Sequence, residues 1–159
     1  MADTLYDEIQ LEIAKYPDRR SAILPALRHA QEHYGWLSPE AIEAVADGLD
    51  LPAARCMAVA SFYDMFFLQP VGEHVVEVCT NLSCALVGSD EVLLAFEEHL
   101  GVKPGGTTAD GRITLRTVEC LGGCGWGPVV SVDEQYEEHF KVDDVAPLID
   151  RLTTTPGGT

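Results

Sequence analysis

Apolar residues recur at helical spacing through the first 70 residues of the chain. The pattern predicts helices over residues 4–16 and 20–34, and two more helices that begin at Ser38 and at Leu51. Serine is a favoured N-cap, and the proline that follows each of these two residues suits a first helical turn. In the fourth helix, three side chains are expected to face inward, those of Cys56, Met57 and Ala60. We therefore predict an amino-terminal helical bundle over residues 1–70.

The pattern changes after Gly72, where β-branched runs replace the helical stripes. Residues 74–78 and 113–118 are predicted strands, and residues 89–101 between them form a predicted helix. A parallel connection needs about a dozen residues or more, and this one is long enough. The two strands are therefore expected to pair in parallel.

The remaining sequence predicts a hairpin and a last helix. Residues 128–132 and 136–140 flank a polar turn, and residues 142–152 have helical apolar spacing. The second part thus has the order β-α-β-β-β-α, an α/β domain with a mixed sheet over residues 71–152. The small polar residues 153–159 are expected to form a flexible tail. The predicted fold class of the whole chain is α+β.

Four of the five cysteines form two pairs, and each pair follows a predicted strand. Cys79 and Cys84 come after the first strand, and Cys120 and Cys124 come after the second. The carboxyl ends of neighbouring parallel strands lie side by side, at the edge where open α/β sheets place their sites. The four thiolates are therefore expected to converge.

Cysteine pairs spaced C-x4-C and C-x3-C have three interpretations. Disulfides suit small secreted scaffolds that lack a core, whereas this chain has 159 residues, 47% of them hydrophobic. Structural zinc usually takes C-x2-4-C knuckles, often with histidine, and neither loop contains a histidine. A 2Fe-2S cluster is wider than one ion and needs two thiolates per iron, so it fits two longer all-cysteine loops best. The residues favour the cluster and leave the other two interpretations open.

Glycines surround the second cysteine pair. Gly122, Gly123, Gly125 and Gly127 lack Cβ atoms, so they let backbone N–H groups turn toward sulfur. Hydrogen bonds of this kind tune the reduction potential of an iron-sulfur centre.

The other reactive residues predict no catalytic site on this chain. Cys56 has no second cysteine near it and is expected to be a buried free thiol. The five histidines are scattered singly, and none is paired with a nucleophile. No glycine fingerprint for a dinucleotide follows a strand. The residues therefore indicate no dinucleotide-binding site on this chain.

The chain carries a formal net charge of −16, which argues against binding to nucleic acid or to an anionic membrane surface. It has no run of 18 apolar residues, so direct membrane insertion is not predicted. The first four residues lack the charged and apolar regions of a signal peptide. These features predict a cytoplasmic protein.

A family resemblance rests on several motifs spread over nearly the whole chain. The motifs of the second part are residues 79–84, 88–91, 99–106, 108–111, 118–124 and 128–130. They resemble the thioredoxin-like 2Fe-2S ferredoxin subunits of NADH dehydrogenases, above all the small iron-sulfur subunit in the NADH-oxidising module of respiratory complex I. Residues 22–27, 35–38 and 59–63 resemble the amino-terminal half of the same family.

The resemblance implies a thioredoxin-like fold for residues 71–152 and one 2Fe-2S cluster held by four ligands, Cys79, Cys84, Cys120 and Cys124. It also implies an electron-transfer subunit of an NADH:quinone oxidoreductase, peripheral to the inner membrane. FMN and NADH would then belong to a flavoprotein partner, beside further iron-sulfur subunits. The bundle of residues 1–70 is not needed to hold the cluster, so we expect it to dock the subunit on its partner.

One departure from the family pattern lies next to the second cysteine pair. The family commonly has alanine before the proline that matches Pro128, whereas this chain has Gly127, preceded by Trp126. The four predicted ligands are unaffected, but the packing and potential of the cluster depend on this position.

Two other functions are compatible with the sequence. One is the same kind of subunit in a soluble NAD-dependent hydrogenase or formate dehydrogenase. The other, from a different class, is a zinc-stabilised interaction module without redox activity.

Overall fold

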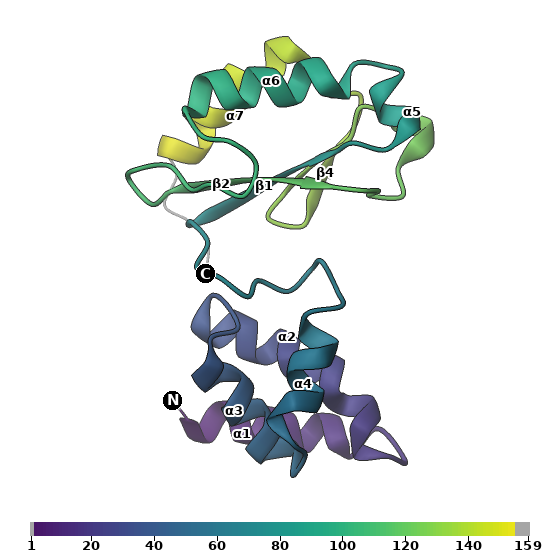
Figure 1. The fold of residues 1–159 in the computed structure, drawn as a ribbon, viewed down its shortest axis with the longest axis vertical. Coiled ribbons are helices and arrows are strands. Elements are labelled where there is room, and N and C mark those ends of the chain that lie inside the picture. Colours follow the sequence, from purple (N-terminus) through teal and green to yellow (C-terminus); the bar gives the residue numbers. More distant parts are fainter. Residues whose placement is uncertain (1, 155–159) are drawn as a thin grey trace. The chain divides into compact units, whose positions relative to one another are not determined.

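The computed structural model describes residues 2–154 and divides the chain into two compact units, Met1–Pro70 and Val71–Thr159. The first unit consists of helices, and the second combines a sheet with helices (Figure 1). The predicted fold class, a helical bundle followed by an α/β domain with a mixed sheet, is confirmed. Within residues 2–154, none of the helices has both the length and the apolar composition needed to cross a bilayer.

The first unit packs four α-helices around one hydrophobic core. The elements are α1 (Ala2–Ile13), the 3-10 turn η1 (Arg19–Ala22), α2 (Ile23–Tyr34), α3 (Pro39–Leu49) and α4 (Ala53–Ala60). Ser38 caps α3 as predicted, because its hydroxyl accepts the Ala41 N–H at 3.1 Å. The core is made by fully buried side chains that include Ile9, Leu27 and Val45.

Three details of the predicted bundle are wrong. The first helix ends at Ile13, because the N–H groups of Lys15 and Tyr16 bond three residues back and Pro17 follows. The second begins at Ile23, after a separate 3-10 turn. Met57 is 37% exposed, because it lies to one side of the buried stripe of Cys56 and Ala60.

The second unit is a four-stranded mixed sheet with helices. Its elements are β1 (His74–Cys79), α5 (Leu82–Ala85), α6 (Ser89–Leu100), β2 (Ile113–Val118), the 3-10 turn η2 (Cys124–Trp126), β3 (Val130–Val132), β4 (Gln135–Glu137) and α7 (Val142–Thr154). The strand order is β2-β1-β3-β4. β1 and β2 are parallel, as predicted, and β3 is antiparallel to both β1 and β4.

Helices α6 and α7 lie on the same face of the sheet (Figure 1). Phe96 of α6 is fully buried there, and its ring stacks on Phe140 at a centroid distance of 5.7 Å. Val76 of β1 and Leu115 of β2 belong to the same core and are fully buried. This shared core fixes the two parallel strands, and therefore the positions of their carboxyl ends.

Several elements of the second unit differ from the predictions, and β3 begins at Val130 rather than at residue 128. The short helix α5 occupies a stretch that was expected to be a loop. Strand β4 ends at Glu137, before His139 adopts a positive φ of 52° that takes the chain out of the extended conformation. Helix α7 continues to Thr154, so residues 153 and 154 of the predicted tail are helical. The rest of that tail, residues 155–159, lies outside the described residues.

Candidate metal centre

The register of the parallel pair brings the two cysteine loops to one edge of the sheet. Cys79, the last residue of β1, lies opposite Val118, the last residue of β2. Thr80 then fastens the two strand ends together, because its N–H and its hydroxyl both donate to the Val118 carbonyl, at 3.0 and 3.2 Å. Cys120 follows two residues later, so both loops start from adjacent points.

The first cysteine pair lies on the core side of this edge. Cys79 and Cys84 are 2% and 1% exposed, and both pack against the fully buried Val129. The backbone holds this contact in place, since the Cys79 N–H donates to the Val129 carbonyl at 3.1 Å. Cys84 lies in α5, so a helix rather than a flexible loop sets its direction.

The second pair lies at the surface. Cys120 and Cys124 are exposed, and their Sγ atoms are 4.0 Å apart. The Gly122 N–H donates to Cys120 Sγ at 3.3 Å, and Gly122 itself has a φ of 79°, a conformation that favours glycine. At Gly123 a Cβ atom would lie 2.9 Å from Val129 Cγ2, so this glycine allows the loop to close on the core. The predicted turning of backbone N–H groups toward sulfur is thus present at Cys120.

The thiols of the two pairs act on each other electrostatically. Burial raises the pKa of the Cys84 thiol, the nearby thiols of Cys79 and Cys124 raise it further, and a backbone hydrogen bond from Val129 opposes them. The pKa of Cys124 is raised chiefly by its hydrogen bond and charge interaction with Cys120, and also by Cys79. A hydrogen bond from the Ser83 hydroxyl lowers it. Neighbouring thiols therefore disfavour the ionisation of Cys84 and of Cys124.

The donor set fits a thiophilic metal group. All five cysteines of the chain are free thiols in the structure, and four of them belong to the two loops that start at this edge. A bound metal offsets the mutual repulsion of thiolates and keeps them deprotonated. Among residues 2–154, no three His, Cys, Asp or Glu side chains are already arranged around a position for a single metal ion. The evidence for a metal group is the thiol set itself.

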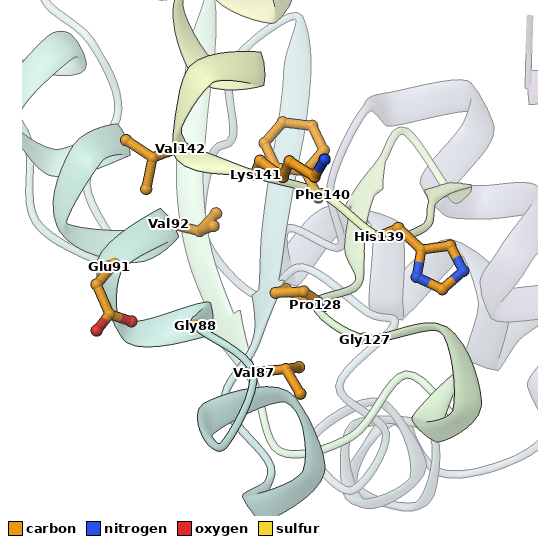
Figure 2. Close-up of a pocket in the computed structure, with 10 residues that line it drawn as sticks. All are labelled: Val87, Gly88, Glu91, Val92, Gly127, Pro128, His139, Phe140, Lys141 and Val142. Atoms are coloured by element: carbon orange, nitrogen blue, oxygen red, sulfur yellow. The ribbon is translucent and has the colours of Figure 1, made fainter.

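Gly127 controls how closely the second loop approaches α5. A Cβ atom there would lie 3.3 Å from Cys84 Sγ and 3.1 Å from Val87 Cγ2. The peptide bond between Gly127 and Pro128 is cis. Beside this segment is a cavity of about 390 Å³, bounded by α6 and by the residues that follow β4. Figure 2 shows Val92 and Pro128 facing its interior.

Large apolar side chains are exposed around the cysteine edge. Leu82 and Leu86 are 71% and 77% exposed, and Trp126 of η2 is 53% exposed. We refer to Leu82, Leu86 and Trp126 as the cysteine-edge patch. Exposed apolar groups gathered at one place often mark a contact surface.

The fifth cysteine, Cys56, is not part of this site. Cys56 belongs to the core of the first unit, is fully buried, and has a pKa raised by that burial. The prediction of a buried free thiol is confirmed. Two features of the site were not predicted from the sequence, namely helix α5 and the unequal burial of the two pairs.

Comparisons with known proteins place the chain among iron-sulfur proteins. A model of the family described as "Thioredoxin-like [2Fe-2S] ferredoxin" matches residues 9–153. One subunit of the NADH-quinone oxidoreductase of Rhizobium meliloti is 38% identical over 166 residues, which cover 97% of this chain and 99% of that protein. The corresponding NADH-quinone oxidoreductase subunit of Mycobacterium tuberculosis is 42% identical over 140 residues, which cover 88% of this chain. The match covers 56% of that mycobacterial protein, about half its length.

A solved structure also shares the fold. An NAD+-reducing [NiFe]-hydrogenase in the air-oxidized state matches with a TM-score of 0.73 and 21% sequence identity, covering 83% of this chain and 23% of that chain. At this identity the likeness concerns the fold alone.

The close contact at Gly127 yields a stability prediction. Gly127→Ala should destabilise the second unit by about 1 kcal/mol, because overpacking against the buried Cys84 outweighs the small entropic gain of replacing glycine. Urea unfolding of the metal-free reduced protein, followed by Trp126 fluorescence in a Trp36→Phe background, measures the change. Gly125→Ala is the matched control, since a Cβ there would have no neighbour within 4 Å. Equal stability of the two variants would contradict the assigned contact.

Proposed function

Because the chain belongs to the thioredoxin-like [2Fe-2S] ferredoxin family, we propose that it is the 2Fe-2S electron-transfer subunit of an NADH-quinone oxidoreductase. The observation that carries the proposal is the convergence of four cysteines at one sheet edge, in a chain that matches the family model over residues 9–153. The relatives in Rhizobium meliloti and Mycobacterium tuberculosis support the choice of host enzyme.

We propose Cys79, Cys84, Cys120 and Cys124 as the ligands of one 2Fe-2S cluster. They provide two pairs of thiols, and a cluster with two irons takes two thiolates per iron. When bound, the cluster would supply one-electron redox chemistry. The core-side pair anchors the site, whereas the exposed pair places the other two thiols at the protein surface.

The protein contributes hydrogen bonds to the sulfurs. The Gly122 N–H donates to Cys120 Sγ at 3.3 Å, and Val129 packs against Cys84. Donors that point at thiolate sulfur stabilise the more negative, reduced state of the site. Hydrogen bonding of this kind favours reduction of the cluster, whereas burial of its ligands alone would oppose reduction.

The partner in this proposal is a flavoprotein that binds FMN and NADH, with further iron-sulfur subunits beyond it. The sequence lacks a dinucleotide fingerprint after a strand, so NADH binding is assigned to the partner. The formal charge of −16 would strengthen association with a basic partner surface at low salt. The proposed location is cytoplasmic, peripheral to the inner membrane.

A second host is a soluble NAD-dependent hydrogenase. The NAD+-reducing hydrogenase shares only the fold at 21% identity and so does not select this host, whereas the Rhizobium meliloti protein is 38% identical. Genes next to the one for this chain distinguish the hosts. Genes for membrane subunits favour the quinone oxidoreductase, and genes for hydrogenase or molybdenum subunits favour a soluble hydrogenase or formate dehydrogenase.

We further propose that the bundle, residues 1–70, docks this subunit on its partner. Three apolar residues in the segment after α4 are exposed: Phe62 is 78% exposed, Tyr63 42% and Met65 43%. We refer to these three residues as the bundle patch. Gln31 fixes the segment, because its side-chain amide donates to the Met65 carbonyl at 2.9 Å and accepts the Phe67 N–H at 2.7 Å. An apolar surface that is held rigid in this way is suited to docking.

The ligand assignment predicts the effect of each cysteine substitution. Changing any one of the four proposed ligands to serine should weaken or abolish the visible absorption of the anaerobically purified protein, because a cluster thiolate is lost. Cys56→Ser is the control and should keep full absorption and iron content, since Cys56 lies in the core of the other unit. A Cys56→Ser protein without iron would overturn the assignment.

The docking proposal predicts how the chain binds the flavin-containing partner. Removal of residues 1–70 should abolish co-purification of the two proteins, and Phe62→Ser with Tyr63→Ser in the full chain should weaken it. Both changes should leave the visible absorption intact, because the four proposed ligands belong to the second unit.

The matched control for docking is the cysteine-edge patch. Leu82→Ser with Leu86→Ser removes apolar surface that is similarly exposed, but from the second unit. If this double variant loses the flavin-containing partner while the bundle-patch variant retains it, the docking role belongs to the cysteine edge.

A further inference from the structure

The sulfurs of the second cysteine pair lie next to each other at the surface. Cys120 Sγ and Cys124 Sγ are 4.0 Å apart, and both residues are exposed. The S–S bond of a disulfide is about 2 Å long, so each sulfur needs to move by roughly 1 Å to form one. Rotation of an exposed side chain about its Cα–Cβ bond moves the sulfur this far without disturbing a packed core.

The loop that carries the pair holds the two cysteines close together and still has room to adjust. At Gly123 a Cβ atom would lie 2.9 Å from Val129 Cγ2, so the middle of the loop lies directly on the core. At Gly122 and Gly125, in contrast, an added Cβ atom would meet nothing within 4 Å. The parts of the loop next to the cysteines can therefore follow the sulfurs as they approach each other.

The other three cysteines are shielded from reagents in solution. Cys79 and Cys84 are 2% and 1% exposed and pack against Val129. Cys56 is fully buried in the core of the first unit. Thiol–disulfide exchange needs direct access of one sulfur to the other, so a bulky oxidant reaches only the exposed pair in the folded chain.

We propose that Cys120 and Cys124 form a redox switch in the metal-free chain, in which a disulfide between them blocks the loading of the cluster. The oxidant is a small disulfide of the glutathione class. One cysteine thiolate attacks its S–S bond, forms a mixed disulfide and releases one glutathione thiolate. The other cysteine thiolate then attacks the protein sulfur of the mixed disulfide, and the second glutathione leaves. The protein loses two protons and two electrons, and glutathione disulfide becomes two glutathione molecules.

The blocking step rests on the proposed 2Fe-2S function. A cluster with two irons takes two thiolates per iron, and the disulfide removes two of the four proposed ligands. A thiol reductant restores both ligands, so the block is reversible. The disulfide itself forms whether or not the chain carries a cluster at another time, so the two parts are tested separately.

The first test maps the oxidised cysteines. The reduced, metal-free full chain is treated with glutathione disulfide, unfolded, alkylated and digested with trypsin, which cuts after lysine and arginine except before proline. The tryptic peptide 117–141 contains Cys120 and Cys124, and the peptide 56–112 contains the other three cysteines. Peptide 117–141 should carry no alkyl group and be about 2 Da lighter than its dithiol form, the mass of two hydrogen atoms. Peptide 56–112 should be fully alkylated.

The same treatment in urea is the control for burial. Both peptides should then lose alkylation, because unfolding exposes every cysteine. Cys120→Ser in the folded chain should stop at the mixed disulfide of Cys124 with glutathione, since the second thiol is missing. Full alkylation of peptide 117–141 overturns the proposal, and so does a pattern that is the same with and without urea.

The second test measures loading. A scaffold protein that carries a preassembled 2Fe-2S cluster is mixed anaerobically with the oxidised or the reduced full chain, without free thiol, and iron is measured on the re-isolated chain. The oxidised chain should take up roughly tenfold less iron, or less still, and dithiothreitol should restore uptake. Equal uptake by the two forms overturns the switch. A reduced chain that takes up no cluster contradicts the proposed function, whereas the peptide map is read independently of it.

Discussion

The parallel pairing of β1 with β2 is the constraint on which the proposed site depends. Its register places Cys79 opposite Val118, and Thr80 ties the two strand ends together through the Val118 carbonyl. The pairing is held by a core in which Val76 and Leu115 are fully buried beneath α6 and α7. A shift of one residue in this register would move these side chains to the opposite face and separate the two cysteine loops.

Convergence of four thiols has an electrostatic consequence. Burial and neighbouring thiols raise the pKa of Cys84, and Cys120 raises that of Cys124, so the metal-free site resists full ionisation. A backbone hydrogen bond from Val129 lowers the pKa of Cys84 and offsets part of this resistance. The arrangement suits a group that brings positive charge of its own and still accepts an electron, which is the property expected of the family to which the chain belongs.

The sequence predicted the features that follow from periodicity and from chain order. Strand, helix and strand between residues 74 and 118 can be connected in only a few ways, so the parallel pair and the neighbouring starts of the two cysteine loops were predictable. Helix α5 was missed because four residues are too few to show a helical period. The unequal burial of the two cysteine pairs was missed because it depends on how Cys79 and Cys84 pack against Val129, which chain order does not show. Met57 was misplaced because a helix of eight residues buries only a narrow stripe.

The central claim is that residues from two strand ends hold one cluster with two irons. Native mass spectrometry of the anaerobically purified full chain, with chemical analysis of iron and acid-labile sulfide, tests it most directly. The account predicts two irons and two sulfides per chain, all lost together when the four cysteines at the sheet edge are alkylated. A chain that carries a single zinc ion and no sulfide would contradict it.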